Sequence, residues 1–308
     1  MKVEKLRGVV SAIVTPFAKD GSVDYATVEK LAHMLVEGGV HGIMATGGTG
    51  EFPHLSDDER VMTTKAIVAG AAGRVPVFAN TSACATHDAV RLSLQAAEVG
   101  ADAIISVPPY YFPLSEPALF SFFTVLADRS PLPLFIYNNP GYTGNPLSPS
   151  LLVELLQHPN IAGLKQSESD LGHFVEVVYQ IRSARRLDKC LMTGIDSQLC
   201  ASLATGGDGI FSTAAGIVPK QVVEIFNLAT AGDFKAAQLA QLRLQPLNRF
   251  LEYEPGYVAP AKEALRMLGW EVGTPRAPLP NLTDDERTRL QRALSDVGVL
   301  PQVESRST

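Results

Sequence analysis

Short apolar runs recur at intervals through the first two-thirds of the chain. Their side chains are apolar continuously rather than alternately, which is typical of parallel strands buried on both faces. Eight runs of this kind predict strands at Val9–Val14, Gly42–Ala45, Pro76–Ala79, Ala103–Val107, Leu132–Tyr137, Ile161–Lys165, Leu191–Thr193 and Gly209–Ser212.

Segments with helical period separate these runs. Two apolar stripes are formed by Val28, Leu31 and Leu35 and by Val90, Leu94 and Ala97. Helix starts are predicted at Ser56 with Glu59 as a capping box, at Ser148, at Asp170 and at Pro219. Eight strands alternating with helices in roughly 230 residues predict an α/β fold, a closed (β/α)8 TIM barrel. A doubly wound open sheet is the alternative, and the strand count disfavours it.

The strand pattern stops after Gly232. Three helices are predicted beyond it, at Phe234–Leu251, Tyr257–Leu268 and Thr283–Leu294, the last with a Thr283…Glu286 capping box. We therefore expect a barrel over residues 1–232 and a C-terminal helical extension over residues 233–308, packed on the barrel. Gln302–Thr308 is expected to be a frayed tail.

Composition narrows the class of protein. The 308 residues are 46% hydrophobic and 19% charged, which suits a large buried core. The net charge of −6 comes without a basic block, so nucleic-acid binding is not expected. Cys84, Cys190 and Cys200 are odd in number and lack metal-ligand spacing, which disfavours disulfides and zinc. No apolar segment approaches the ~20 residues that span a bilayer, and we expect a cytoplasmic protein.

The candidate site lies where the strands end, because barrel active sites form at the carboxyl ends of the strands. The second strand ends in a glycine-rich turn, Gly47–Glu51, whose backbone N–H groups and Thr49 hydroxyl suit an anion. No lysine follows the turn as in a phosphate-binding loop. Tyr111 follows the fourth strand, Tyr137 ends the fifth, and Lys165 ends the sixth. Each tyrosine is either a proton shuttle or a ring that seals the barrel.

Lys165 is the most informative of these residues. A buried lysine loses its proton more readily, and a neutral amine attacks a ketone to form a Schiff base. The alternative is an ordinary lysine whose ammonium reaches water. The sequence shows no acid pair, no nucleophile–His–Asp set and no metal-ligand cluster. Without a metal site to stabilise an enolate, an amine–ketone adduct is the remaining way to make a carbon nucleophile from a keto acid. No metal or other cofactor is expected.

Taken together, these motifs resemble the dihydrodipicolinate synthase / N-acetylneuraminate lyase family. The resemblance covers nearly the whole chain, including its ending Ala261-Lys262…Leu265…Leu268-Gly269…Arg276-x-Pro278-Leu279. The motifs that carry it are Gly47–Glu51, Pro109-Tyr110-Tyr111, Tyr137-Asn138-x-Pro140 and Gly163-x-Lys165-x-Ser167.

The family resemblance implies roles for these residues. Lys165 would form a Schiff base with pyruvate or another 2-keto acid, and Tyr137 would be the general acid/base. The carboxylate of the keto acid would be held by the Thr49 side chain and by the N–H groups of Gly48 and Thr49. These residues belong to the turn that continues to Gly50. In the synthases Tyr111 completes a proton relay across a subunit contact, so a homotetramer (dimer of dimers) is implied. The second-substrate pocket is expected to involve Tyr142, Asn145, Ser167, Thr193 and Phe211–Ala215.

Two positions depart from the family pattern. Gly48 stands where most members have Thr or Ser, and Tyr142 stands where synthases have an Arg that binds the aldehyde's carboxylate. Losing that contact costs about 2–3 kcal/mol. We therefore predict a Schiff-base lyase, of the class I aldolase or dehydratase type, that acts through Lys165 on pyruvate or a related 2-keto acid, with its second substrate unassigned. The alternatives are 4-hydroxy-tetrahydrodipicolinate synthase activity on pyruvate and aspartate semialdehyde, and a keto-acid-binding protein without turnover.

Overall fold

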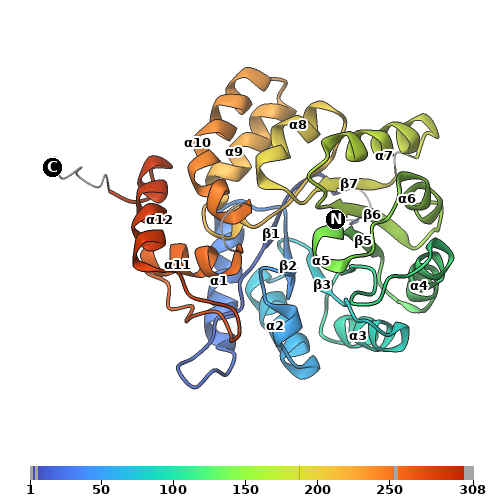
Figure 1. Cartoon of the computed structure of the whole chain (residues 1–308), viewed down its shortest axis with the longest axis horizontal. Coiled ribbons are helices and arrows are strands. Elements are labelled where there is room, and N and C mark those ends of the chain that lie inside the picture. The colour runs from blue at the N-terminus through green and yellow to red at the C-terminus, as the bar shows by residue number, and fades with distance from the viewer. Residues whose placement is uncertain (1–2, 4–5, 187, 253–255, 302–308) are drawn as a thin grey trace.

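Eight parallel strands close into a barrel that is surrounded by helices (Figure 1). The computed structural model describes residues 3, 6–186, 188–252 and 256–301. The strands are β1 Gly8–Ala12, β2 Gly42–Ala45, β3 Val77–Asn80, β4 Ala103–Ser106, β5 Leu134–Asn138, β6 Ile161–Gln166, β7 Cys190–Thr193 and β8 Gly209–Ser212. Gly8 of β1 pairs with Gly209 of β8, which closes the sheet. The predicted TIM barrel is confirmed, and the open sheet is excluded.

The barrel helices follow the strands in sequence. They are α1 Tyr25–Glu37, α2 Asp57–Ala71, α3 Thr86–Glu98, α4 Glu116–Arg129, α5 Pro140–Thr143, α6 Pro149–Leu155, α7 Leu171–Ser183, α8 Leu199–Ala204 and α9 Pro219–Thr230. The predicted starts are confirmed: Ser56 and Glu59 form a capping box, and Pro219 opens α9. Ser148 and Asp170 each accept a backbone N–H of the helix that follows.

The predicted stripe on α3 is wrong at Leu94, and Ala97 is only half-buried. Leu94 is 46% exposed, whereas the buried side of the helix carries Ala89, Val90, Leu92 and Ala96. The small alanines lie against the barrel layer, and the helix is rotated so that Leu94 points outward. Spacing alone could not choose between these neighbouring stripes, because both have helical period.

Three further helices lie on one side of the barrel, coloured orange to red in Figure 1. They are α10 Phe234–Glu252, α11 Val258–Met267 and α12 Asp284–Asp296. The helical C-terminal part is confirmed, as is the Thr283 capping box of α12. The exact division at residue 232 stays a prediction, and the predicted tail Gln302–Thr308 lies outside the described residues. None of the helices described is long and apolar enough to cross a membrane.

Two charged contacts join this C-terminal part to the glycine-rich turn. Lys262 Nζ of α11 lies 2.6 Å from Glu51 Oε1, and both side chains are buried. The backbone N–H of Arg276 donates to the other Glu51 oxygen at 2.8 Å. Glu51 has a left-handed backbone with a φ of 59°, a strained conformation for a side chain of its size. The C-terminal part therefore holds the end of this turn in place.

Arg276 also makes a two-pronged contact with Glu59 of α2, at 2.6 and 2.8 Å. This hydrogen bonding holds the pKa of Glu59 below its usual value. A depressed pKa stabilises the fold above the unfolded-state pKa and loses that stabilisation as pH falls through the folded pKa. We expect Glu59→Gln to lower the free energy of unfolding by roughly 1–2 kcal/mol at neutral pH.

Urea unfolding at neutral and acid pH checks this prediction. The difference between Glu59→Gln and the parent should shrink as pH falls below the usual carboxylate pKa of about 4.3. Glu224→Gln is the matched control, because its partner Arg243 and Glu224 itself are both at least half exposed. Glu224→Gln should lower the free energy of unfolding only slightly, because exposed ion pairs contribute little to stability. A Glu59→Gln cost that is as small as the control's would contradict the prediction.

Candidate active site

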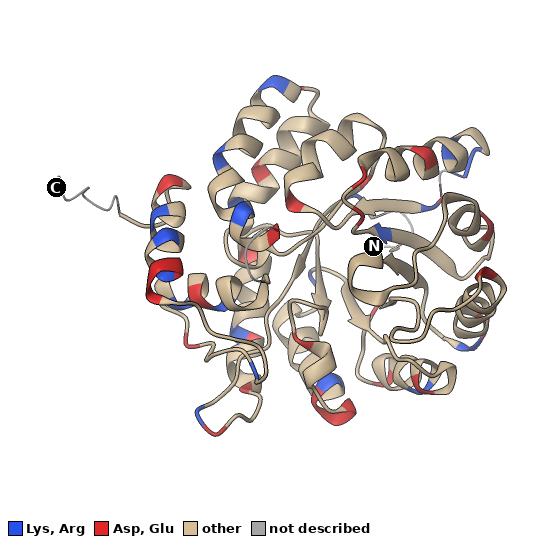
Figure 2. Ribbon diagram, viewed as in Figure 1, with Lys and Arg blue, Asp and Glu red and all other residues tan. Residues whose placement is uncertain are grey.

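Lys165 is the one charged residue on the eight strands described above. It lies next to the carboxyl end of β6 and is 5% exposed. Most Lys, Arg, Asp and Glu residues lie on the outer helices and loops instead (Figure 2). A lysine kept in the interior of a barrel bears a desolvation cost, and such a cost points to a functional reason for its presence.

The Lys165 ammonium group is surrounded by aromatic rings and sulfur. Nζ lies 3.8 Å from the centre of the Tyr137 ring, 5.7 Å from that of Phe211 and 3.8 Å from Met44 Sδ. In the described part of the chain, no oxygen accepts a hydrogen bond from this nitrogen. By contrast, Lys189, which immediately precedes β7, donates to two carbonyls, at 2.6 and 3.0 Å. Lys165 is thus held by its surroundings without an oxygen partner.

A layer of aromatic rings forms the floor beneath Lys165. Phe78 makes edge-to-face contacts with Phe135 and Phe211, at centroid distances of 5.1 and 5.3 Å. Gly163, two residues before Lys165 on β6, leaves room for this layer, because a Cβ there would collide with the Phe135 ring. The floor closes the barrel below the lysine, so substrate reaches Nζ from the carboxyl end of the strands.

Tyr137 lies one residue before the end of β5, beside Lys165, and its hydroxyl has a hydrogen-bond partner. Asn139 Nδ2 donates to Tyr137 Oη at 3.1 Å. Because the amide occupies an acceptor position on the phenol oxygen, the phenol proton is left to point toward another group. The side chain is 7% exposed, and its ring lies directly under Nζ. Tyr137 is therefore placed to pass a proton to a group bound at Lys165.

The glycine-rich turn lies across the barrel from Lys165. Thr49 Oγ1 is 2.9 Å from Thr213 Oγ1, and the Gly50 carbonyl accepts from Thr15 at 2.7 Å. Among the described residues, nothing accepts a hydrogen bond from the N–H groups of Gly48 or Thr49. Unpaired backbone donors beside a threonine hydroxyl suit a carboxylate. The turn thus has the groups that the predicted carboxylate site requires.

We call the space above Lys165 the lysine cavity; its volume is about 230 Å³. Two carboxyl groups line it, Asp196 after β7 and Glu252 at the end of α10. Asp196 accepts from the Ser212 hydroxyl and from the backbone N–H of Thr213 and of Ala214. Burial is the main cause that raises the pKa of Asp196 and the pKa of Glu252. Lys165 is the one basic residue among the described residues that line this cavity.

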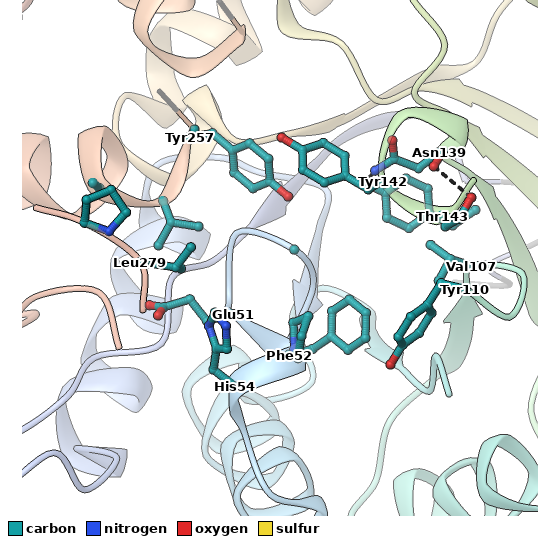
Figure 3. Close-up of a pocket in the computed structure, with 17 residues that line it drawn as sticks. Glu51, Phe52, His54, Val107, Tyr110, Asn139, Tyr142, Thr143, Tyr257 and Leu279 are labelled. Carbon is teal, nitrogen blue, oxygen red and sulfur yellow. Dashed lines mark hydrogen bonds between the residues drawn. The ribbon is translucent and has the colours of Figure 1, made fainter. Parts of the chain in front are cut away.

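A second space of about 270 Å³, the apolar cavity, adjoins the first (Figure 3). Its walls include Phe52, Val107, Tyr110 and Leu279. Five residues line both cavities and separate them: Gly48, Tyr137, Asn139, Tyr142 and Tyr257. Figure 3 shows Tyr257 and Tyr142 lying side by side at one edge of the apolar cavity. Their rings meet edge to face at 5.8 Å.

The structure brings most of the predicted site residues together. Lys165, Tyr137, Gly48, Thr49 and Tyr142 all line the lysine cavity, as do Ser167 and Thr213. Gly50 lies in the turn behind the cavity wall, and Phe211 lies in the floor.

Tyr111 and Asn145 lie away from the cavities, and four other predicted residues also line neither of them: Thr193, Ser212, Ala214 and Ala215. Tyr111 is 85% exposed and lines neither of them within this single chain. Asn145 instead fixes the loop after β4: its amide donates to the carbonyls of Pro109 and Phe112 and accepts from Leu114. This loop carries Tyr111, whose φ of 82° is unusual for a residue with a side chain.

Three titratable residues that line the lysine cavity were not predicted from the sequence: Asp196, Glu252 and Tyr257. Asp196 follows β7, so the search at strand ends had the signal to find it. Glu252 and Tyr257 come from the C-terminal helical part, beyond the last strand. No strand pattern points to them, because their position depends on how α10 and α11 pack on the barrel.

Comparison with known proteins agrees with this geometry. Residues 5–297 match the model of the dihydrodipicolinate synthetase family. The chain belongs to this family. Among curated relatives, the 4-hydroxy-tetrahydrodipicolinate synthase of Haloarcula marismortui is 35% identical over 290 residues, which cover 94% of this chain and 92% of that protein.

Solved structures of the family have the same fold. The chloride-inhibited dihydrodipicolinate synthase of Acinetobacter baumannii, complexed with pyruvate, has a TM-score of 0.89 and 34% identity, with 96% and 99% of the two chains covered. The Thermotoga maritima dihydrodipicolinate synthase has a TM-score of 0.91 and 29% identity, with 96% and 100% covered. As a family member, the protein is a lyase of the Schiff-base, class I aldolase type.

Proposed function

We propose that Lys165 forms a Schiff base with pyruvate or a similarly small 2-keto acid and that the adduct is joined to, or released from, an aldehyde. The observation that carries the proposal is the Lys165 amine, buried among rings and sulfur and facing a cavity without an oxygen partner in the described residues. The pyruvate bound to the Acinetobacter baumannii relative supports the choice of keto acid.

The chemistry uses groups that line the lysine cavity. The lone pair of Nζ attacks the ketone carbon, and the ketone oxygen takes protons and leaves as water. The iminium then draws electrons from the neighbouring carbon, which loses a proton and becomes an enamine. The enamine carbon attacks an aldehyde carbon, whose oxygen takes a proton, and water releases the product from the lysine. Tyr137 is the proton carrier in these steps, because its hydroxyl is oriented by Asn139 beside Nζ.

The glycine-rich turn is proposed to hold the carboxylate of the keto acid. Thr49 supplies its hydroxyl, and Gly48 and Thr49 supply N–H groups that no described residue accepts from. Gly50 shapes the turn, since a Cβ there would meet the Thr46 Cα at 3.0 Å. This arrangement aims the ketone of a short keto acid at Lys165.

The second substrate is proposed to carry hydroxyl groups rather than a second carboxylate. Asp196 and Glu252 line the cavity, and none of the arginines that the structure describes does. Ser167 Oγ is buried without a hydrogen-bond partner in the described residues, so it suits a substrate hydroxyl. Synthesis of 4-hydroxy-tetrahydrodipicolinate from aspartate semialdehyde remains the alternative, and the relatives named for that activity support it.

Tyr142→Arg distinguishes these two substrates. A guanidinium at this position would offer a charge-assisted contact to a carboxylate, worth about 30- to 150-fold in kcat/KM. We expect the parent enzyme to react slowly with aspartate semialdehyde and Tyr142→Arg to react faster by that factor. Coupled assays with pyruvate measure both rates. Rapid turnover of aspartate semialdehyde by the parent would contradict our substrate proposal and favour the synthase.

The test of the proposed function needs no second substrate. Enamine formation removes a methyl proton of pyruvate, so the enzyme should exchange these protons for deuterium in heavy water, and NMR follows the loss of the methyl signal. Exchange well above the enzyme-free rate is the expected result. No exchange of pyruvate or 2-oxobutyrate would contradict the proposal and would favour a keto-acid-binding protein.

We extend the proposal to a cytoplasmic homotetramer in which Tyr111 of one subunit reaches the cavity of another. Tyr111 and its neighbour Phe112 are 85% and 70% exposed, a large apolar surface for a single loop. The three free cysteines suit a reducing compartment. Sedimentation velocity of the parent and of Tyr111→Asp would test the assembly, because the charge should weaken the contact.

A further inference from the structure

Tyr257 places a hydroxyl directly over Gly48. It stands just before the first residue of α11, in the helical part that packs on the barrel. A Cβ at residue 48 would lie 3.3 Å from Tyr257 Cζ and would overlap the hydroxyl oxygen. Any residue at position 48 other than glycine would therefore push Tyr257 away. Gly48 and Tyr257 are therefore complementary in shape: the absence of a side chain at residue 48 leaves the space that the Tyr257 hydroxyl fills.

The Tyr257 hydroxyl has no hydrogen-bond partner within the described residues. It nevertheless lies in the wall between the two cavities, beside Tyr137 and Tyr142. Burial is the main cause that raises the pKa of Tyr257, and the charges of Tyr137 and Tyr142 contribute to the same direction. A phenol in this setting keeps its proton at neutral pH, and an unpaired one is poised to bond to whatever fills the cavity.

We propose that Tyr257 relays protons to Tyr137 and takes the place of the hydroxyl side chain that Gly48 lacks. When Tyr137 gives its proton to the departing oxygen on the Lys165 adduct, Tyr257 passes its own proton to the Tyr137 oxygen by way of a water molecule in the cavity. Tyr257 then regains a proton from solvent in the cavity, and water leaves from the adduct. This role rests on the proposed function, because it requires the Schiff base at Lys165.

Tyr257 is a positioning residue in this scheme, since it acts through Tyr137. Its ring also packs against Tyr142, so a packing role must be separated from the relay. Tyr257→Phe keeps the ring and removes the hydroxyl alone. Tyr257→Ala removes both and clears the space over residue 48. In the double variant, Gly48→Thr combined with Tyr257→Ala, the threonine hydroxyl on the turn replaces the missing Tyr257 hydroxyl.

The experiment follows deuterium exchange into the methyl group of pyruvate as a function of pH. Tyr257→Phe should slow the maximal rate roughly 10- to 100-fold and shift the pH profile. The pyruvate concentration that gives half the maximal rate should change little. Tyr257→Ala should be as slow, and the double variant should be at least several-fold faster than Tyr257→Ala.

Two results would overturn the relay. One is a Tyr257→Phe enzyme with the parent's rate and pH profile. The other is a double variant no faster than Tyr257→Ala, which would leave Tyr257 a packing role. Either result leaves the proposed function intact as long as the parent enzyme exchanges pyruvate protons. If the parent itself shows no exchange, the proposed function has failed instead.

Discussion

Replacing Lys165 by alanine is expected to abolish pyruvate proton exchange, with a loss of at least about 10³-fold. Without the amine no iminium forms, so the methyl protons of the keto acid stay as weakly acidic as in solution. Lys165→Arg should be equally inactive, because a guanidinium stays protonated and cannot form the adduct. NMR measurement of the exchange rate checks both variants.

Lys220→Ala is the control for this prediction, because Lys220 is exposed on α9, away from both cavities. Circular dichroism should show that Lys165→Ala keeps the fold, since the rings beneath it pack with one another. An alanine variant that retains a tenth or more of the parent's rate would contradict the role of Lys165.

The second large effect is expected at Tyr137. Tyr137→Phe keeps the ring 3.8 Å below Nζ and removes the hydroxyl that Asn139 holds. Loss of a positioned proton carrier costs about 10²–10⁴-fold in rate. We expect a loss in this range in kcat for exchange, with little change in the pyruvate concentration at half-maximal rate, because the carboxylate is bound by the turn.

Tyr179→Phe serves as its control, since Tyr179 is 65% exposed on α7. The two kinetic quantities separate proton transfer from packing, because loss of a proton carrier lowers kcat and leaves the half-saturating pyruvate concentration nearly unchanged. A Tyr137→Phe enzyme with an unchanged exchange rate would assign proton transfer to another group.

The barrel could be predicted from the sequence because each strand is a continuous apolar run. Burial on both faces demands such runs, and turns or helix caps bound them. Lys165 was found for the same reason: a lysine next to the end of an otherwise apolar strand breaks the pattern. Leu94 shows the limit, because two neighbouring stripes on α3 have the same period and packing against the barrel chooses between them.

Tyr257 could not be predicted, although Gly48 was singled out. The sequence showed that position 48 lacks a side chain, but it did not show which group fills that space. The space is filled by the Tyr257 hydroxyl, from the start of a helix more than 200 residues later. Sequence spacing does not tell which residue of α11 reaches the turn. The ion pair between Lys262 and Glu51 joins the same two segments and was hidden for the same reason.

The most direct test of the central claim is borohydride reduction of the enzyme in the presence of pyruvate, followed by peptide mass mapping. Reduction turns a Schiff base into a stable secondary amine, so the modified lysine can be located. We predict one reduced pyruvyl group, on the peptide that contains Lys165, and none without pyruvate. An adduct on a different lysine, or no adduct at any pyruvate concentration, would contradict the assignment of Lys165 as the nucleophile.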